Sequence, residues 1–518
     1  MYWCKIATTN QEFEEISKLN YTTFVEEIPQ HPKNEHKRLV DQFHHENTYI
    51  IVYKDEEIVG MLALRDQRPF SLDQKIGAVE QTLPTRHCKK LCEVRLLAVK
   101  KAYRNGRVFI RLTQALVSYL FERNYTACVI SGTTREEKLY SQMGFQQFAP
   151  VVGTKEAQFL PMILTREASK PLRDRLARQK FIFYPGPVEQ VEPLQHTNVS
   201  HRSLSFQMYY EELTSQLQIL SQANYVVTLV GSGTLANDAM LAQLKFDFPT
   251  SKGLILTNGE FGERLVKQAV QQRLAFDTLH FAWHDSISLE HVEGRVREAD
   301  YKWLLYVHGE TSTGVCNGNQ LVDLAFRYRL KLCADCISSF GAYPFSLASF
   351  YLATAVSGKA LGALGGLAFV FSQEKLRIND APYYLNLGYY HEKQIPFTLP
   401  ASLVVNVLTA LSHYPKRYAL LTRRWERLKE TSFYQKYAFK KSPYPMVASI
   451  QLPRQLAYLS RDLKLNGVYV YDESTYLHKR CLVQLSIIQP RFEMALERLL
   501  EIYRHYDKVM ESSAETLD

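Results

Sequence analysis

The sequence contains few cysteines, glycines and prolines, and it has no long apolar run. Only 8 of the 518 residues are cysteine, which favours a reducing compartment. Glycine (23) and proline (20) are too scarce for a collagen-like or proline-rich chain. The N-terminus lacks a basic region followed by an apolar one, so no signal peptide is predicted, and no run is long enough to span a membrane. We therefore expect a cytoplasmic protein without a membrane partner.

No block of basic residues is present either. The chain has 62 basic and 53 acidic residues, a net charge of +9 that is small for its length. This balance predicts no nucleic-acid partner, although it suits anionic small molecules. Hydrophobic residues make up 46% and charged residues 22%, as in globular proteins, and 518 residues are enough for two or three domains.

One pair of cysteines has the spacing of a zinc motif. Cys333-Ala334-Asp335-Cys336 fits Cys-x-x-Cys, but no second pair and no histidine cluster follows at ligand spacing. The sequence therefore favours two small apolar residues on a buried strand, and no metal site is expected.

A charged stretch at 165–175 separates two segments with different patterns. Before it, strand-like runs at 49–53 and 58–64 precede a helix-like stretch near 108–122. After it, strand-like runs alternate with amphipathic helices, which predicts a mostly parallel sheet covered on both faces. The predicted organisation is an α+β domain at 1–168, a linker at 169–179 and an α/β domain at 180–518.

Four motifs of the larger domain each follow a strand-like run. The turn Gly231-Ser232-Gly233-Thr234 precedes a helix, an arrangement that aims backbone N–H groups at a phosphate. Phe261 lies in the second motif and Thr311 in the third, where α/β sheets bind ligands. Asp335 ends the fourth strand, and Lys359 follows 24 residues later. An acid, a lysine and a phosphate site together are what pyridoxal phosphate chemistry requires.

In their order, these motifs resemble the class V, fold-type I aminotransferases. The pattern is most similar to 2-aminoethylphosphonate–pyruvate transaminase, with alanine–glyoxylate aminotransferase next, over about two thirds of the chain. The resemblance implies a seven-stranded large lobe at about 195–400 and a small lobe at about 401–518 that includes 180–194. It implies pyridoxal 5'-phosphate, a homodimer, and amine and 2-oxo acid substrates.

The resemblance also implies roles for individual residues. Lys359 matches the Schiff-base lysine and Asp335 the partner of the pyridinium nitrogen. The other matched positions are the phosphate cup (Ser232, Gly233 and Thr234), the stacking aromatic (Phe261), the hydroxyl near the phenolic oxygen (Thr311) and the residue reaching the phosphate from a neighbouring subunit (Thr398).

Two departures concern the substrate. The family has an Arg-Ile-Gly strand whose arginine clamps the substrate's anionic group, whereas the best register here places Val483 at that position. Arg480 lies three residues earlier, on the opposite face of a strand unless the chain is locally shifted. The family also has an asparagine directly before the Schiff-base lysine, and this chain has Gly358 at that position. The substrate is therefore not predicted beyond its class.

The first segment resembles the GNAT acyltransferases. Glu93 lies inside a strand-like run where that family often has a general base for the amine. Tyr140, in a Leu-Tyr-x-x-x-Gly-Phe element, matches the tyrosine that protonates the departing thiolate. Arg104 and Gly106 lie in the loop matching the pyrophosphate arm, although Arg107 and Phe109 occupy its glycine positions. The resemblance implies acetyl-CoA, another acyl-CoA or an acyl carrier protein as donor.

The stretch Phe24–Glu27 and the Glu93-Val94 pair add a partial likeness to N-acyl amino acid and acyl-homoserine lactone synthases. Two hypotheses follow. One is a bifunctional enzyme in which a transaminase is coupled to an amine N-acyltransferase. The alternative is an aminotransferase whose GNAT-like domain is a non-catalytic binding or regulatory module. A desulfurase is disfavoured because no cysteine lies in a mobile-loop context.

Overall fold

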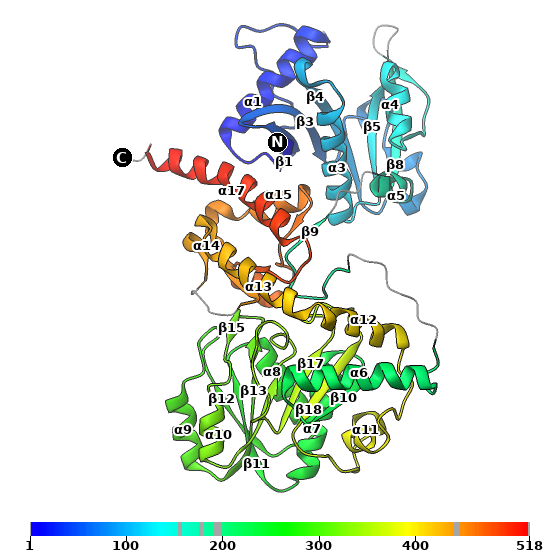
Figure 1. Cartoon of the computed structure of the whole chain (residues 1–518). Helices are drawn as coiled ribbons and strands as arrows, with labels where there is room; N and C mark the ends of the chain where they lie inside the picture. The colour runs from blue at the N-terminus through cyan, green and yellow to red at the C-terminus, as the bar shows by residue number, and fades with distance from the viewer. Residues whose placement is uncertain are drawn as a thin grey trace. The chain divides into compact units, whose positions relative to one another are not determined.

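The computed structural model describes residues 2–28, 30–153, 158–175, 180–190, 199–439 and 445–515. The chain forms two compact units (Figure 1). Unit 1 comprises Met1–Lys180, Tyr458–Val468 and Glu501–Asp518, and unit 2 comprises Phe181–Ala457 and Tyr469–Leu500. The predicted small lobe thus differs from the structure, because two of its segments belong to unit 1.

Unit 1 contains an eight-stranded sheet in the order β1-β2-β3-β4-β5-β8-β6, with β7 paired to β8. Its strands are β1 (Tyr2–Ile6), β2 (Thr48–Lys54), β3 (Glu57–Arg65), β4 (Leu91–Val99), β5 (Ala127–Thr133), β6 (Gln146–Gln147), β7 (Val152–Gly153) and β8 (Gln158–Thr165). Its helices are α1 (Asn10–Tyr21), α2 (Asp73–Ile76), α3 (Arg107–Glu122), α4 (Glu137–Gln142), α5 (Arg166–Arg175) and α15 (Leu459–Leu465). Helix α5 therefore occupies much of the predicted linker.

The core of unit 1 forms where α3 packs on the sheet. Val108, Leu112, Ala115 and Leu116 recur at helical spacing on one face of α3, and all are buried. Strands β4 and β5 are parallel and pair only from Leu91 to Glu93 and from Ala127 to Val129. Leu96 in β4 has φ of 55°. The paired parts of β4 and β5 therefore end well before the strands do.

The C-terminal segments of unit 1 complete the edge of its sheet at β1. The side chain of Asn466 accepts a hydrogen bond from the backbone N–H of Cys4 (2.8 Å) and donates to its carbonyl (2.7 Å). Trp3 stacks on Tyr53 (ring centroids 5.0 Å apart) and contacts His505 edge-on (4.8 Å). Edge strands carry unpaired backbone groups, and here a side chain from 462 residues away satisfies them.

We predict that Asn466→Ala destabilises unit 1 by about 2–4 kcal/mol, because it leaves buried backbone groups of Cys4 without partners. Thermal and urea denaturation measure the effect. Lys508→Ala is the control, since it removes only an exposed ion pair between Lys508 and Glu56 in the same unit. Equal stability of both variants would contradict the bracing role of Asn466.

Unit 2 is built on a seven-stranded sheet in the order β10-β18-β17-β16-β13-β11-β12. All of its neighbouring strands are parallel except β18, which is antiparallel to β10 and β17. The predicted mostly parallel, seven-stranded sheet is confirmed. The strands are β10 (Tyr225–Val230), β11 (Lys252–Thr257), β12 (Phe276–His280), β13 (Tyr301–Val307), β16 (Lys331–Asp335), β17 (Leu352–Val356) and β18 (Leu367–Ser372).

Helices cover both faces of this sheet (Figure 1). One face packs against α6 (Leu204–Ser221), α9 (Leu289–Glu298), α10 (Val322–Arg327) and α12 (Ala401–Ser412). The other packs against α7 (Gly233–Asp247), α8 (Glu260–Gln271) and α11 (Leu387–Lys393). Alternate strand residues enter the two cores: Leu254 and Leu256 face one, and Ile255 faces the other. Cys333 and Cys336 are buried in opposite cores.

The remaining elements of unit 2 are short strands and peripheral helices. The strands are β9 (Phe181–Ile182), β14 (Gly309–Glu310), β15 (Val315–Cys316), β19 (Val447–Gln451), β20 (Val468–Tyr469) and β21 (Leu482–Ser486), paired as β14-β15, β19-β21 and β20-β9. The helices are α13 (Tyr414–Lys429), α14 (Ser432–Tyr437), α16 (Thr475–His478) and α17 (Phe492–Glu515), the last of which continues into unit 1.

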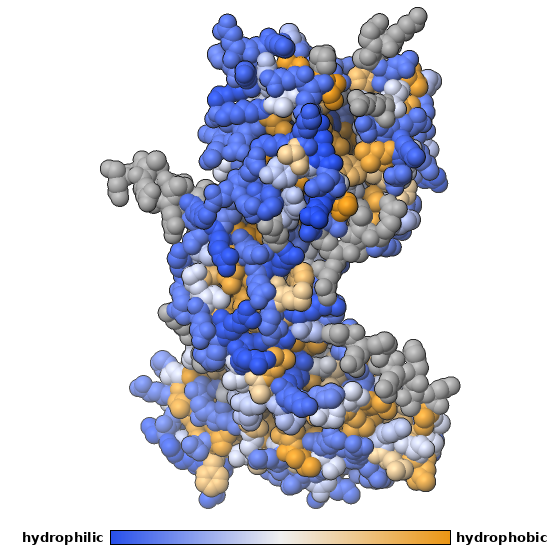
Figure 2. All heavy atoms as spheres, turned by 45° about the horizontal axis from the view of Figure 1, so that its top comes forward, coloured by the Kyte–Doolittle hydropathy of each residue, from blue (hydrophilic) through white to orange (hydrophobic). Residues whose placement is uncertain are grey.

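Within the described ranges, no helix is both long and apolar enough to cross a membrane. Figure 2 shows hydrophilic residues over much of one face, with apolar residues dispersed among them. The same part of the chain contains no cluster of three or more His, Cys, Asp or Glu residues that could hold a metal ion.

Candidate active site

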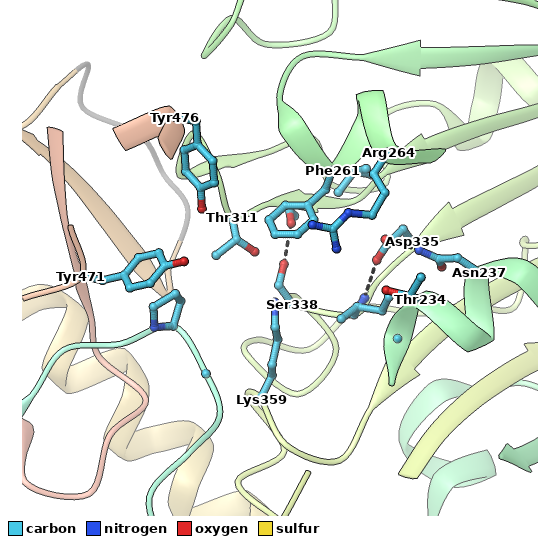
Figure 3. A pocket seen from close by; sticks show the side chains of 16 residues that line it. Thr234, Asn237, Phe261, Arg264, Thr311, Asp335, Ser338, Lys359, Tyr471 and Tyr476 are labelled. Carbon is cyan, nitrogen blue, oxygen red and sulfur yellow. Dashed lines mark hydrogen bonds between the residues drawn. The ribbon is translucent and has the colours of Figure 1, made fainter. Parts of the chain in front are cut away.

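Unit 2 contains a cavity of about 280 Å³ at the carboxyl ends of β13 and β16 (Figure 3). This end of a parallel sheet is where α/β proteins bind ligands. Most of the side chains that line this cavity come from residues 233–359, and Tyr471 and Tyr476 come from the region between β20 and the end of α16. The polar lining residues are Thr234, Asn237, Arg264, Thr311, Asp335, Ser338, Lys359, Tyr471 and Tyr476.

Asp335 is the buried acid of the cavity and ends strand β16. Its carboxylate accepts hydrogen bonds from the Asn237 side chain (2.8 Å) and from the backbone N–H of Ile337 (2.9 Å). Asn237 is oriented by Thr354, whose hydroxyl donates to its amide oxygen (2.8 Å). Burial raises the pKa of Asp335, and these hydrogen bonds and the nearby Lys359 oppose that rise.

Lys359 enters the cavity from the turn after β17. Its Nζ lies 5.4 Å from the centroid of the Phe261 ring. Burial lowers the pKa of Lys359, whereas the charges of Asp335 and Glu310 oppose that decrease. A Cβ on the preceding Gly358 would lie 2.6 Å from the Cα of Gly365. The turn therefore has no room for the asparagine that the family carries there.

The N-terminus of α7 supplies the predicted phosphate end of the cavity. Gly233 and Thr234 line the cavity, and Ser232 is an exposed N-cap residue whose side chain makes no capping hydrogen bond. A Cβ on Gly233 would lie 2.4 Å from Ile337 Cδ1, so the helix approaches that loop without a side chain between them. The positive end of α7 faces the cavity at its first turn.

Thr311 gives the clearest sign of a missing ligand group. Its Oγ1 is buried and has no hydrogen-bond partner among the residues that the structure describes. Buried hydroxyls are rarely left unpaired, and this one faces the cavity beside Lys359 (Figure 3). The acid, the lysine, the free hydroxyl and the helix N-terminus together fit pyridoxal phosphate.

The structure adds five polar residues that the motifs did not identify. Arg264 lies one turn after Phe261 on α8, with its guanidinium carbon 4.9 Å from that ring, so helical spacing could have indicated it. Ser338 donates a hydrogen bond to the Gly309 carbonyl. Asn237 links Asp335 to Thr354 through its side-chain amide. Tyr471 and Tyr476 point their hydroxyls toward Thr311 from a distant part of the chain (Figure 3), and no local pattern marks them.

Thr398 does not line this cavity in the single chain. It is exposed and follows Phe397, whose ring stacks on Tyr384 at 4.2 Å. Its predicted role through a neighbouring subunit stays a prediction.

The strand expected to carry the substrate arginine contacts the Thr311 turn through a neutral side chain. Gln484 of β21 is buried and donates hydrogen bonds to the carbonyls of Thr311 (2.7 Å) and Ser312 (3.1 Å). Val483, which the sequence register placed at the arginine position, is its neighbour on the strand and faces the other way, and that register stays a prediction. Arg480 lies elsewhere: its guanidinium carbon is 4.1 Å from the Trp283 ring, and it pairs with Glu260 at 3.7 Å.

In unit 1, Glu93 is buried and its carboxylate is fully engaged. It accepts hydrogen bonds from the Ser71 N–H (2.9 Å), the Ser71 hydroxyl (2.6 Å) and the Leu72 N–H (2.9 Å). These contacts tie the turn before α2 to β4. Glu93 therefore braces this turn, and its predicted role as a base stays a prediction.

The other residues singled out in unit 1 lie at loop and helix ends. Tyr140 of α4 packs close to Gly132 at the end of β5, and burial raises the pKa of its phenol. Arg104 is exposed, donates to the Val99 carbonyl (2.9 Å) and pairs with Glu27. Gly106 is the N-cap of α3, with φ of 85°. No hydrogen bond or ion pair joins Glu93, Tyr140 and Arg104 in the described structure.

We predict that Glu93→Gln lowers the stability of unit 1 by about 1–3 kcal/mol, because an amide cannot accept all three hydrogen bonds. Thermal denaturation measures this effect. Glu80→Gln makes the same chemical change at an exposed position that pairs with Arg68, and we expect no measurable shift. An unchanged midpoint for Glu93→Gln would refute the bracing role.

Comparisons with known proteins agree with this two-unit organisation. Unit 2 has the fold-type I aminotransferase fold. The alanine–glyoxylate aminotransferase of Nostoc sp. superposes on 64% of this chain and 96% of its own, with a TM-score of 0.56 and 22% identity. Residues 15–166 match the family model of N-acyl amino acid synthase FeeM. The predicted GNAT-like and class V resemblances are thereby confirmed at the level of these domains.

Two curated relatives match unit 2 in sequence. The 2-aminoethylphosphonate–pyruvate transaminase of Pseudomonas entomophila (strain L48) is 34% identical over 160 residues, which are 30% of this chain and 42% of the relative. The soluble hydrogenase 42 kDa subunit of Anabaena cylindrica is 27% identical over 256 residues, 45% of this chain and 66% of the relative. This chain thus spans less than two thirds of the length of either relative. Residues 15–166 are thus similar to the FeeM family of N-acyl amino acid synthases, and unit 2 is homologous to aminotransferases.

Proposed function

We propose that this chain is a bifunctional enzyme. Unit 2 transaminates a small amino acid or an aminophosphonate-like amine with a 2-oxo acid, and unit 1 transfers an acyl group to an amine. The observation that carries the proposal is the grouping of Lys359, Asp335 and the unpaired Thr311 hydroxyl around one cavity at the N-terminus of α7. Two amine chemistries in one polypeptide suggest that the amine of one site is the substrate of the other.

The residues that the motifs identified each have a defined task in this proposal. Pyridoxal phosphate, when bound, supplies an electron sink for bond breaking at the amine-bearing carbon. Lys359 holds the cofactor and moves a proton at its Nζ, which its lowered pKa favours. Asp335 holds the proton on the pyridine nitrogen. Phe261 covers the ring, Thr311 donates to the phenolic oxygen, and the backbone of Gly233 and Thr234 binds the phosphate.

A homodimer is part of the proposal. Tyr383 and Tyr384 are 58% and 50% exposed, and Val230, just before the phosphate turn, is 39% exposed. Val230 and Tyr384 line a second, small cavity together with Thr398, and exposed apolar side chains grouped in this way favour a protein partner. A second copy would bring its Thr398 to the phosphate.

We predict that Lys359→Ala abolishes both the visible absorption band of bound pyridoxal phosphate and transamination, because no other lysine lines the cavity in the described residues. Absorption spectra and an amino-donor screen read by mass spectrometry measure both. Lys331→Ala is the matched control: this lysine pairs with Glu374 at the surface, and its loss leaves the band intact. A band retained in Lys359→Ala would exclude the assignment.

The acyltransferase function of unit 1 is supported by its FeeM match and by Tyr140. Burial raises the pKa of this phenol, and a protonated phenol is what an acid for a departing thiolate requires. Glu93 would act as the general base for the acceptor amine after it releases a hydrogen bond from Ser71 or Leu72. Arg104 and Gly106 would approach the donor's pyrophosphate.

A specific observation favours the alternative, a binding or regulatory unit 1. Arg107 and Phe109 occupy the positions where a bare glycine backbone would bind pyrophosphate, and Phe109 packs toward the core. If unit 1 is catalytic, its acyl donor is acetyl-CoA, another acyl-CoA or an acyl carrier protein. If unit 1 is regulatory, it binds a ligand and transfers no acyl group.

We predict that full-length protein binds acetyl-CoA or an acylated carrier protein, and that Tyr140→Phe lowers acyl transfer about 10²-fold with binding unchanged, as expected for loss of a general acid. Calorimetric titration and mass spectrometry of N-acylated products measure the two effects. Tyr119→Phe, at a buried position on α3, is the control. Binding of neither donor would favour the regulatory alternative.

A further inference from the structure

Glu310 is a fully buried carboxylate beside the cavity, and the proposed chemistry gives it no task. Its neighbours Gly309 and Thr311 line the cavity, whereas its own side chain is directed to α8. No lysine, arginine or histidine of the described residues lies within 4.0 Å of its oxygens. A buried acid without an ion-pair partner needs another reason to be there.

Its partners are all hydrogen-bond donors. Oε1 accepts from the Ser312 hydroxyl (2.5 Å), the Ser312 N–H (3.2 Å) and the Phe261 N–H (3.4 Å). Oε2 accepts from the Gly262 N–H (3.0 Å). The Ser312 hydroxyl in turn accepts from the Glu260 N–H (2.9 Å). Glu310 and Ser312 therefore satisfy all three N–H groups of the first turn of α8.

Helix α8 has no N-cap side chain of its own. Its N-cap residue is Gly259, and a Cβ there would lie 2.5 Å from Glu310 Cδ. The glycine makes room for a carboxylate that comes from β14, 50 residues along the chain. A negative charge at a helix N-terminus also interacts favourably with the helix dipole.

We propose that Glu310 is a positioning residue of the cofactor site: it locks the first turn of α8 to the Thr311 turn, and so fixes Phe261 and Thr311 on their two sides of the cavity. The charge of the same carboxylate also opposes the decrease in the pKa of Lys359, after that of Asp335. Glu310 thus supports the shape of the ring site and contributes to the electrostatics of the lysine that holds the ring. This inference rests on the proposed function in that Lys359 is the cofactor-binding lysine.

The test compares Glu310→Gln with Glu260→Gln in the full-length protein. Both variants neutralise a carboxylate at the start of α8, but Glu260 is half-exposed and pairs with Arg480 instead of binding the helix N–H groups. The first readout is the pH dependence of Lys359 acetylation by acetic anhydride in cofactor-free protein, quantified by peptide mass spectrometry. Asp335, Glu310 and Arg264 are the charged groups that act on this lysine.

The charge of Glu310 opposes the decrease in the pKa of Lys359, so its neutralisation moves the labelling midpoint to lower pH. The second readout is the dissociation constant of pyridoxal phosphate, which increases about fivefold or more as Phe261 loses its support. Glu260→Gln changes neither quantity. Identical midpoints and affinities in the two variants, with Glu310→Gln merely less stable, would overturn the proposal.

Ser312→Ala covers the case in which Glu310→Gln does not fold. It keeps the carboxylate and removes the bridge between Glu310 and the Glu260 N–H, so cofactor affinity falls. Unchanged affinity in Ser312→Ala would refute the positioning role. Failure of the proposed function is seen separately, as absence of cofactor binding in the unaltered protein, and the labelling readout does not depend on turnover.

Discussion

Burial of the Asp335 carboxylate beneath the cavity is the constraint on which the rest of this site depends. A carboxylate in an apolar core is costly unless donors and a cation compensate it. Asn237 and the Ile337 N–H supply the donors, and Lys359 supplies the charge. Asn237 lies on α7, so the helix that satisfies the acid is also the helix whose N-terminus faces the cavity. One buried charge thereby fixes the acid, the helix end and the lysine relative to one another.

Sequence patterns could predict the residues that strand ends deliver to this site, because their positions follow from local rules. Lys359, Asp335 and Phe261 each come directly after a strand or its turn, and parallel strands bring such positions to one edge. Tyr471 and Tyr476 could not be predicted in this way, since tertiary packing of short elements brings them in. The contact of Gln484 with the Thr311 turn could not be predicted either: alternation identifies a strand, but not what each face meets when both faces are buried.

Unit 1 shows the same limit in a different form. Its sheet and α3 follow from periodicity, and the α+β class was predictable. The role of Glu93 was not, because a buried glutamate on a strand has the same sequence pattern whether its oxygens face a substrate or cap a turn. The hydrogen bonds from Ser71 and Leu72 show that its oxygens cap the turn, and its role as a base stays a prediction. Gly106, by contrast, is marked by its left-handed backbone at the start of α3, which glycine adopts most readily.

The path of the chain argues that the two units act as one protein. Residues 458–468 and 501 onward belong to unit 1, whereas 469–500 belong to unit 2, so the chain passes between the units four times. The edge strand β1 depends on Asn466, and the buried Asp462 accepts a hydrogen bond from Tyr506 in the same unit. No single cut therefore releases a complete acyltransferase-like unit.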